Sequence, residues 1–566
     1  MKRWTLRKHN ADAVNRLAAE LNVTPLVAAL LICRGHETPE KALQFLNPCP
    51  DHLHEPLLLK GMREAVGRIQ KAVDAREKIL VWGDYDVDGT TGAVLLRRML
   101  TLLGAADTVF HVPNRFTEGY GINIPALDQA QKDGVSLVIS VDCGIRSFAP
   151  LEWARDHNLD VIVTDHHLSD EVRGNPPAVA VVNPNQPGCP YPDKHLAGVG
   201  VAFKLAHALL RERGLEYEVP AFLKIAAIGT VADVMDLTGE NRAIVAMGLL
   251  DLPKTDNWGL KALMEVSDCR SDMTSYHIGF RIGPRINAAG RMDVARHVIE
   301  LFEAGDFAKA RQLAGLLDSR NRERQHVQEQ ITQLALSETQ NIACNHFIVV
   351  AGEGWHQGVI GLAASRIAEK LHRPTIVISI KDGVGHGSAR SIPNFHLLNA
   401  LGCCEELFEQ YGGHAAAAGM KIKAENIPTM QKKLNEYAAR TLSPDDLIPE
   451  LKIDALVTSH SLCLDLVGQL GVFEPFGAGN PKPVFVTRNL VLRDEPYVMK
   501  DKHLKFRLWG EDNKQFDAVW WDGVERSKGQ TLKPNSRIEL AYVPEANVWQ
   551  GNSRLQLVVE DLRADN

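Results

Sequence analysis

The sequence predicts an α/β protein in which a parallel-sheet domain and a smaller α/β domain are joined by a long helix and followed by a small all-β barrel. Three observations indicate this fold class. Continuous apolar runs separated by helix-length segments begin at residue 78, and a charged stretch almost free of glycine and proline covers about 306–339. Short strands separated by turns follow residue 451, a spacing typical of a small antiparallel barrel. A length of 566 residues is enough for three or four such domains.

The composition is that of a folded protein, with 45% hydrophobic and 23% charged residues. The longest apolar run covers about residues 25–33, which is shorter than the roughly 18 residues that a membrane helix needs, so we expect a cytoplasmic protein. The 9 cysteines form no CxxC pair, which argues against a disulfide framework and a zinc ribbon. A net charge of −7 argues against an indiscriminate nucleic-acid coat but allows a local basic channel.

The first domain is expected to cover residues 76–300, after a helical N-terminal segment of residues 1–75. Its strands are expected at 78–83, 135–141 and 160–164, each of them an apolar run. Strands that are apolar throughout are buried on both faces, which is typical of a parallel sheet covered by helices.

The remaining elements follow in order along the chain. Residues 301–340 are predicted to form one connecting helix. Residues 341–450 are predicted to form the second α/β domain, with HFIVVA and PTIVISI as strands around a helix near 361–371. Residues 451–566 are predicted to form the barrel, whose strands include HLKFRLW, FDAVWW, RIELAY and LQLVV.

Carboxylates and histidines follow each of the three predicted strands of the first domain. They are Asp84, Asp86 and Asp88 after the first strand, Asp142 after the second, and Asp165, His166 and His167 after the third. Ligand sites in open parallel sheets lie outside the carboxyl ends of the strands, so these side chains should converge.

Crowded carboxylates stay ionised only beside a cation, and aspartate oxygens mixed with imidazole nitrogen suit Mn²⁺ or Mg²⁺. We therefore expect a site for two divalent metal ions. Asp142 is the candidate bridge, and Asp233 in GTVADV can supply a further oxygen. Adjacent residues of an extended segment point in opposite directions, so we assign His166 to metal and His167 to a substrate phosphate.

Other interpretations of these residues are weaker. A lone DxD most often caps a turn, and His-His pairs and a single aspartate are mostly structural, but three groups in register favour a metal site. DVDGT also fits the start of a haloacid-dehalogenase-type phosphatase, which has no use for the histidine pair. Cys143 lacks the arginine six residues on that a cysteine phosphatase needs, so we assign it no role.

The motifs GDYDVDGTT, SVDCGI, TDHH and GTVADV resemble the successive motifs of the DHH phosphoesterases. NRFTEGYG, NPN, LAGVGVAFK, GPRINAAGR, GWHQGVIGLAASR, GSARS and GGHAAAAG extend the resemblance over roughly residues 80–420. Asp236, where family members usually have proline, and Cys143, often asparagine or threonine, depart from the pattern without touching an expected ligand. The resemblance implies that the metal ligands are Asp86, Asp88, Asp142, His166 and Asp233, with Asp84 and His167 as catalytic neighbours.

The second α/β domain resembles the DHHA1 domain, which in this family holds the nucleic-acid backbone and its terminal phosphate. GHGSARS offers backbone N–H groups, the Ser388 hydroxyl and the Arg390 guanidinium, which together suit a dianionic phosphate. Further candidates for substrate binding are Arg366 and His414 in this domain and Arg115, Arg285, Asn287 and Arg291 in the first.

The barrel resembles an OB fold. Aromatic residues stand among basic ones, an arrangement that suits base stacking over a groove that follows the nucleic-acid backbone. The aromatic residues are Phe506, Trp509, Trp520, Trp521 and Trp549, and the basic residues are Lys500, Lys502, Lys505 and Arg507. Because side chains alternate along a strand, about half of these aromatics must belong to the core instead.

The resemblance implies a single-stranded-DNA-specific 5′–3′ exonuclease that hydrolyses phosphodiester bonds by a two-metal mechanism and releases mononucleotides in DNA recombination and repair. It implies single-stranded DNA, a single-strand-binding protein and a RecQ-type helicase as partners. One alternative is a DHH phosphoesterase for short oligonucleotides or pyrophosphate, for which the long helix and the barrel are surplus. Another is a non-catalytic DHH scaffold, which typically loses ligands that this chain retains.

Overall fold

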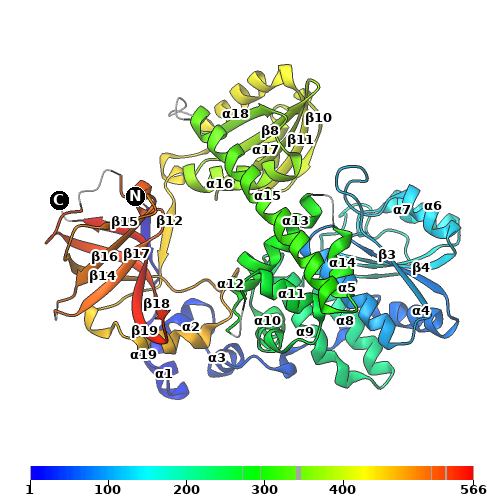
Figure 1. Ribbon diagram of the computed structural model, residues 1–566, viewed down its shortest axis with the longest axis horizontal. Helices are drawn as coiled ribbons and strands as arrows, with labels where there is room; N and C mark the ends of the chain where they lie inside the picture. Colours follow the sequence, from blue (N-terminus) through cyan, green and yellow to red (C-terminus); the bar gives the residue numbers. More distant parts are fainter. Residues whose placement is uncertain are drawn as a thin grey trace. The chain divides into compact units, whose positions relative to one another are not determined.

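A computed structural model of the chain describes residues 2–269, 272–292, 295–339, 346–511, 513–528 and 532–564 (Figure 1). The chain forms two compact units. The N-terminal unit contains residues 11–321 and 470–482, and the C-terminal unit contains residues 1–10, 322–469 and 483–566. Each unit is described by itself below.

The N-terminal unit is built on a five-stranded sheet with the strand order β3-β2-β4-β5-β6, in which every neighbouring pair is parallel. The predicted parallel sheet is confirmed. The strands are β2 (Lys78–Gly83), β3 (Asp107–His111), β4 (Val135–Val141), β5 (Asp160–Thr164) and β6 (Ala180–Val182).

Helices cover both faces of this sheet. One face packs on α4 (Met62–Asp74), α5 (Val87–Leu102) and α8 (Gly198–Glu212), which share a core with the inward residues of β2 and β4. The other face packs on α6 (Ile124–Lys132) and α7 (Phe148–Asp156). Burial on both faces explains why the strands are apolar throughout.

The rest of the N-terminal unit is helical. It contains α1 (Ala11–Leu21), α2 (Pro25–Cys33), α3 (Pro39–Leu46), α9 (Leu223–Ala232), α10 (Gly239–Asp251), α11 (Trp258–Val266), α12 (Ser275–His277), a π-helix (Ile278–Ile282), α13 (Gly283–Arg291) and α14 (Arg296–Phe302). Among the described residues, no single helix is long and apolar enough to span a membrane. The pair α1 and α2 passes that test only together, and the chain bends by 114° between them.

The N-terminal segment contains one element that departs from the helical prediction. Residues Arg3–Leu6 form strand β1, which pairs in parallel with β12 (Glu450–Ile453) in the C-terminal unit. Four residues carry too short a pattern to reveal a strand, because the partner that stabilises it lies far away in the sequence.

The predicted connecting helix is α15 (Phe307–Thr339), 33 residues long (Figure 1). Its residues to Asn321 belong to the N-terminal unit and those from Arg322 on to the C-terminal unit. Leu313 and Leu317 join the core of the former, and Ile331 and Ala335 join a core of the latter.

The C-terminal unit contains the second α/β sheet, with the strand order β10-β11-β9-β8-β7. β7 and β8 are parallel, and the other neighbours are antiparallel. One face packs on α15 and α16, and the other on α17 and α18. The elements are β7 (Ile348–Glu353), α16 (Gln357–Leu371), β8 (Thr375–Lys381), β9 (Val384–Arg390), α17 (Leu397–Gly402), β10 (Phe408–Gly413), β11 (Ala417–Lys423) and α18 (Ile427–Thr441).

The predicted barrel is a seven-stranded sheet with the order β13-β14-β18-β19-β17-β16-β15, and an additional pairing of β14 with β16 closes it. Its elements are β13 (Ala455–Leu456), α19 (Leu464–Leu470), β14 (Phe485–Leu492), β15 (Tyr497–Met499), β16 (His503–Trp509), β17 (Gln515–Trp520), α20 (Gly523–Arg526), β18 (Arg537–Trp549) and β19 (Asn552–Ala564).

The barrel divides its aromatic side chains between core and surface. Phe506 and Trp520 are buried, so neither can stack on a base. Trp521 is 50% exposed and Trp549 is 74% exposed. Trp521 and Trp549 therefore remain the main candidates for base stacking. Trp509, at the end of β16, is a third candidate but is partly buried.

Candidate metal centre and substrate-binding residues

The loop after β2 places three carboxylates at the carboxyl end of the sheet. Asp86 is the N-cap of α5, and its side chain accepts a hydrogen bond from the amide of Gly89 at 3.0 Å. A Cβ atom on Gly89 would lie 2.5 Å from the backbone nitrogen of Asp84, so only glycine allows the loop to turn this tightly. Asp84 ends up beside the first turn of α5, which carries Asp88.

The strand-end residues converge as the sequence predicts. Asp142 Oδ1 lies 3.2 Å from His166 Nε2, Asp233 Oδ2 lies 3.6 Å from that nitrogen, and Asp88 Oδ2 lies 3.8 Å from it. Three overlapping groups have ligand atoms within 4.8 Å of one another: Asp142 with His166 and His167, Asp88 with His166 and Asp233, and Asp84 with Asp86 and Asp142.

The carboxylates of this cluster repel one another. Burial, followed by the charges of neighbouring aspartates, raises the pKa of Asp84, Asp88 and Asp142 well above the ordinary value. Burial and the charge of Asp86 also raise the pKa of Asp233 to about 7. Side chains arranged in this way are stable as anions only when positive charge is supplied among them.

The donor atoms fit divalent metal ions. Within the described residues, Asp84 Oδ1 and Asp142 Oδ1 are buried and have no hydrogen-bond partner. Buried carboxylate oxygens without partners are costly, and a cation would satisfy both. Aspartate oxygens with one imidazole nitrogen form the ligand set that suits Mn²⁺ or Mg²⁺.

Asp88 also has a structural role. Its Oδ2 and Oδ1 accept hydrogen bonds from the amides of Gly198 at 2.6 Å and Val199 at 2.7 Å, at the start of α8. The carboxylate therefore caps α8 while facing His166. The sequence did not predict this second role, because the amides that Asp88 meets lie 110 and 111 residues further along the chain.

The two histidines differ in charge. Burial and the neighbouring His167 lower the pKa of His166 to about 4, so its ring is neutral and can offer a nitrogen to a metal. Burial opposes charge on His167, but its hydrogen bond to Asp165, 2.8 Å between Nδ1 and Oδ1, outweighs this and raises its pKa to about 9.

Asp165 received no role from the sequence, although it follows β5 directly. Its Oδ1 accepts hydrogen bonds from the amides of both His166 and His167, and its Oδ2 accepts one from the amide of Ile145. The NPN motif holds the same segment, since Asn185 Nδ2 donates to the carbonyl oxygen of His166 at 2.7 Å. The signal in the sequence that could have revealed this role was the position of Asp165, directly before the two histidines.

The loop of residues 114–123 presents Arg115 and Tyr120 to the cluster. The Arg115 guanidinium lies 5.0 Å from the centre of the Tyr85 ring, between Asp84 and Asp86 in sequence. The Tyr120 hydroxyl donates to the carbonyl oxygen of Asp142 at 3.0 Å. Arg115 thus lies beside the loop that carries Asp84 and Asp86, and its role in substrate binding stays a prediction. Tyr120 was not assigned a role from the sequence.

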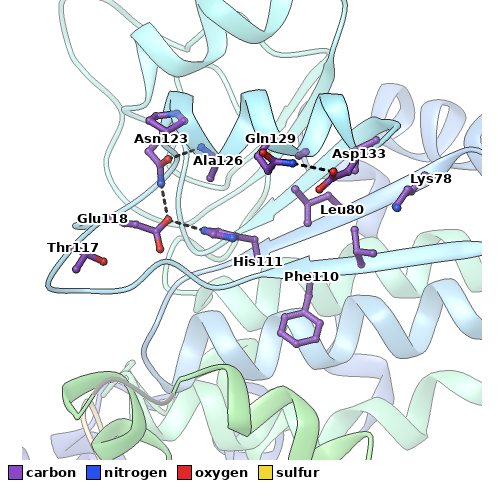
Figure 2. A pocket seen from close by; sticks show the side chains of 14 residues that line it. Lys78, Leu80, Phe110, His111, Thr117, Glu118, Asn123, Ala126, Gln129 and Asp133 are labelled. Atoms are coloured by element: carbon purple, nitrogen blue, oxygen red, sulfur yellow. Dashed lines mark hydrogen bonds and ion pairs between the residues drawn. The ribbon is translucent and has the colours of Figure 1, made fainter.

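A groove of about 660 Å³ borders this loop (Figure 2). It lies between α6 and the edge strand β3, and Leu80 lies among its apolar lining residues. At one end the Glu118 carboxylate accepts hydrogen bonds from His111, at 2.9 Å, and from Asn123, at 3.1 Å (Figure 2). None of the predicted ligands lines this groove.

Two predicted substrate residues of α13 have structural partners instead. Arg285 donates to Asp318 Oδ1 at 2.9 Å and to the carbonyl oxygen of Arg281 at 2.7 Å, so the structure favours a role in tying α13 to α15. Asn287 Oδ1 accepts a hydrogen bond from the amide of Val87, between Asp86 and Asp88 in sequence, and therefore supports the metal loop. Arg291, at the end of α13, lies close enough to Tyr85 to influence its pKa.

In the C-terminal unit, Ser388 and Arg390 share one face of β9. The Arg390 guanidinium donates to the Ser388 hydroxyl at 3.1 Å. A Cβ atom on Gly361 of α16 would lie 2.9 Å from that hydroxyl oxygen and 3.2 Å from Arg390 Nη2, so the helix leaves room for both side chains only because this residue is glycine. On the neighbouring strand β11, Gly419 pairs with Ser388. Because Gly419 has no side chain, the surface of the sheet beside the Ser388 hydroxyl is uncovered there.

Arg366 and His414 are placed less favourably for phosphate binding than Ser388 and Arg390. Arg366 donates to Glu329 of α15 at 2.7 Å, which occupies its guanidinium within the unit. His414 lies on the exposed turn between β10 and β11.

Family models match three regions of the chain: the N-terminal domain of the DHH family at residues 78–230, the DHHA1 domain at 345–440 and the RecJ OB domain at 453–561. The chain is 38% identical to the single-stranded-DNA-specific exonuclease RecJ of Bacillus subtilis over 564 residues, which covers 99% of this chain and 70% of that protein. It is 32% identical to RecJ of Escherichia coli, covering 98% of both chains.

Solved structures agree. The crystal structure of RecJ from Thermus thermophilus in complex with Mn²⁺ matches with a TM-score of 0.85 and 31% identity, covering 100% of this chain and 80% of that one. The Mg²⁺ complex of the same protein matches with a TM-score of 0.78 and 30% identity, covering 100% and 79%. Matches of this identity over nearly the whole chain show that it belongs to the RecJ family of single-stranded-DNA-specific exonucleases.

Proposed function

We propose that this metal-dependent exonuclease degrades single-stranded DNA from the 5′ end and releases mononucleotides by a two-metal mechanism. The observation that carries the proposal is the convergence of aspartates and histidines at the strand ends, with unpartnered buried oxygens on Asp84 and Asp142. A site with this excess of buried carboxylates matches the need of phosphodiester hydrolysis for concentrated positive charge.

Asp86, Asp88, Asp142, His166 and Asp233 would hold the two cations, with Asp142 between them. When bound, the cations supply an activated water and stabilise the charge that develops on the phosphate. The chain's own part is to fix the ligands: Asp165 orients the segment that carries both histidines, and Asn287 holds the loop that carries Asp86 and Asp88. His167, whose ring Asp165 orients through Nδ1, is assigned to a non-bridging phosphate oxygen of the substrate.

Ser388 and Arg390 are proposed to bind the 5′-terminal phosphate. A terminal phosphate carries about one negative charge more than an internal phosphodiester, so a charged hydrogen-bonding site favours a chain end over a chain interior. His414 and Arg366 are weaker candidates for this site, and Arg115 and Arg291 are the candidates nearest to the metal loop.

Single-stranded DNA is the proposed substrate, and a single-strand-binding protein and a RecQ-type helicase are the proposed partners in recombination and repair. We propose a cytoplasmic location, which the bacterial origin of the DNA-processing relatives supports. We also propose that the chain has five parts, with boundaries at residues 75, 300, 340 and 450. Two segments depart from this division: residues 3–6 pair with β12, and residues 470–482 pack within the N-terminal unit.

The test uses 5′-labelled and 3′-labelled single-stranded, duplex and dinucleotide substrates with Mn²⁺ or Mg²⁺. The proposal predicts that the 5′-labelled single strand releases its label at once as a mononucleotide, that the 3′-labelled single strand shortens stepwise, and that the duplex is hydrolysed little. Preferred hydrolysis of the dinucleotide would instead support a phosphoesterase for short oligonucleotides, and hydrolysis of none of the substrates would support a scaffold.

A further inference from the structure

Residues 470–482, here called the strap, have the sequence LGVFEPFGAGNPK and belong to the N-terminal unit. In sequence they run from the last residue of α19 to shortly before β14, and the chain on both sides of them belongs to the C-terminal unit. A segment taken from the barrel region of the sequence therefore packs within the unit that carries the metal cluster.

A buried arginine anchors the first half of the strap. Arg242 of α10 is 2% exposed. Its guanidinium donates to the carbonyl oxygens of Phe473 at 3.0 Å and Glu474 at 2.7 Å, and to that of Phe45 at 2.8 Å. The same guanidinium lies 3.8 Å from the centre of the Phe45 ring. Carbonyl oxygens and an aromatic face replace the water that a buried cation loses, so the strap has a specific place on α10.

A buried asparagine fixes the second half. Asn480 is fully buried, and its Nδ2 donates to the carbonyl oxygens of Phe473 at 2.8 Å and Pro475 at 2.9 Å. Its Oδ1 accepts a hydrogen bond from Arg34 Nε at 2.9 Å. These bonds close the strap into a compact turn.

The turn of the strap lies directly on the chain that follows Asp233. The amide of Leu237 donates to the carbonyl oxygen of Ala478 at 2.8 Å. A Cβ atom on Gly477 would lie 2.6 Å from Leu237 Cδ1, and one on Gly479 would lie 3.1 Å from Asp236 Cβ. The glycines are therefore needed for the approach.

Asp233 lies at the start of the segment that the strap contacts at Leu237. It stands at the end of α9, and Val234 follows in a left-handed conformation with φ 58°. Val234 is 71% exposed, so its own side chain does little to hold the turn. Leu237 is buried, and its contacts with the strap fix the far end of the segment whose near end carries a predicted ligand.

The strap also contacts α12, which is connected to the loop that carries Asp86 and Asp88. The Ser275 hydroxyl donates to the carbonyl oxygen of Phe476. Ser275 begins the helical run that continues to Asn287, whose side chain holds the amide of Val87 in the metal loop. Both sides of the predicted metal site are thus connected to one short segment.

From these contacts we infer that the strap is a positioning element of the metal centre, with Gly477 as the residue that sets its distance from Leu237. The inference rests on the proposed metal-dependent function. It assigns to residues 470–482 a role in metal affinity rather than in binding DNA.

The test measures Mn²⁺ binding to the full-length, chelator-treated protein without DNA, from the electron paramagnetic resonance signal of free Mn²⁺. Gly477→Ala should raise the dissociation constant about tenfold, the size of effect seen when groups that orient metal ligands are changed. Adding Leu237→Ala removes the Cδ1 and Cγ atoms that the new methyl group meets, so the double variant should bind Mn²⁺ more tightly than Gly477→Ala.

Gly471→Ala is the matched control, because among the described residues no heavy atom lies within 4 Å of a Cβ atom at that strap position. It should bind Mn²⁺ as the wild type does. Thermal melts monitored by circular dichroism check that each variant folds. If Gly477→Ala does not fold, Ser275→Ala takes its place, since it removes one hydrogen bond and adds no atom.

Wild-type affinity in the folded test variant, or equal losses in Gly471→Ala and Gly477→Ala, would overturn the inference. A wild-type protein that binds no Mn²⁺ and leaves single-stranded DNA intact would instead overturn the proposed function. The two failures are therefore distinguishable.

Discussion

Both the backbone and the side chain of Asp142 are held in place by their surroundings. Its backbone is left-handed, with φ 62°, and its amide donates to the carbonyl oxygen of Thr164 at 3.0 Å. The Tyr120 hydroxyl holds its carbonyl oxygen, while its carboxylate faces His166. Asparagine tolerates this backbone conformation, so Asp142→Asn removes the charge with little effect on the turn.

Asp142→Asn should lower hydrolysis of single-stranded DNA by more than about a hundredfold, because losing a direct ligand costs more than losing a group that only orients one. Binding of the DNA, measured by fluorescence anisotropy, should change little. Cys143→Ala, at the neighbouring buried position, is the control and should keep wild-type turnover. A tenth of wild-type turnover in Asp142→Asn would exclude the bridging role.

Arg390→Ala should weaken binding of 5′-phosphorylated single strands by about 2 kcal/mol, roughly thirtyfold, because a hydrogen bond to a charged group contributes about this much. Binding of matched 5′-hydroxyl strands should change far less. Arg366→Ala, whose guanidinium already bonds to Glu329, provides the comparison. Equal losses of Arg390→Ala on both strands would mean that Arg390 holds an internal phosphate.

The residues at the strand ends were predictable because parallel strands bring their carboxyl ends to one edge whatever lies between them. The roles of Arg285 and Asn287 were not predictable. The contact with Asp318 ties Arg285 to α15, and the amide of Val87 gives Asn287 its role. Only the three-dimensional path of the chain brings those partners close. An arginine in a glycine-containing motif looks the same in sequence whether it binds substrate or an aspartate.

At the scale of elements, the region around the strap has a titratable neighbour. His36 packs against Phe45, with 4.4 Å between ring centres and the rings tilted by 32°. Burial, followed by the charges of Arg242 and Arg34, lowers the pKa of His36 to about 4. The folded state therefore holds His36 neutral under conditions in which the unfolded chain binds a proton there.

The contribution of His36 to the free energy of unfolding should therefore be fully present above pH 6.5, the ordinary pKa of histidine. It should be lost as the pH drops from 6.5 towards 4. The contribution of His36 is on the order of 2 kcal/mol once its partial exposure is considered. Urea unfolding of the wild type and of His36→Gln at pH 7 and pH 5 measures it. The loss between these pH values should be smaller in His36→Gln, and an equal loss would contradict the assignment.

The barrel provides a second prediction at this scale. Trp549 ends β18, is 74% exposed and is therefore available to a base. Trp549→Ala should weaken binding of single-stranded oligonucleotides by about 1–3 kcal/mol, the cost of losing one stacked base, without lowering the melting temperature. A melting temperature that falls while DNA affinity stays constant would assign Trp549 a structural role.

Sequence pattern predicted the barrel but could not divide its aromatic residues. Trp520 and Trp521 are adjacent, yet one is in the core and the other half exposed, because β17 ends between them. Strand β1 and the strap were missed for a related reason. Each is short, and its stability comes from a partner that is remote in sequence.

At the scale of the whole molecule, metal ions should stabilise the fold. The carboxylates of the cluster repel one another in the folded state, and a cation bound there removes this cost. Mn²⁺ at a hundredfold excess over its dissociation constant should add about 2.7 kcal/mol to the free energy of unfolding for each ion bound. Differential scanning calorimetry with Mn²⁺ and with chelator measures the change, which Asp142→Asn should largely abolish.

Truncation after residue 451 is a poor test of the barrel, because it also removes the strap and half of the strand that pairs with β1. Point variants on the barrel surface separate DNA binding from metal affinity, whereas truncation combines them.

The pairing of β1 with β12 has a consequence for synthesis of the protein. Arg3 pairs with Glu450, so during synthesis the RWTL segment waits for a partner that lies 447 residues further along the chain. At roughly 5–20 residues per second, the wait lasts on the order of a minute. During that time the RWTL segment has an unpaired strand edge, which chaperones or neighbouring nascent chains can bind. Arg3 within the segment and Lys2, Arg7 and Lys8 beside it carry positive charges that oppose association between such edges.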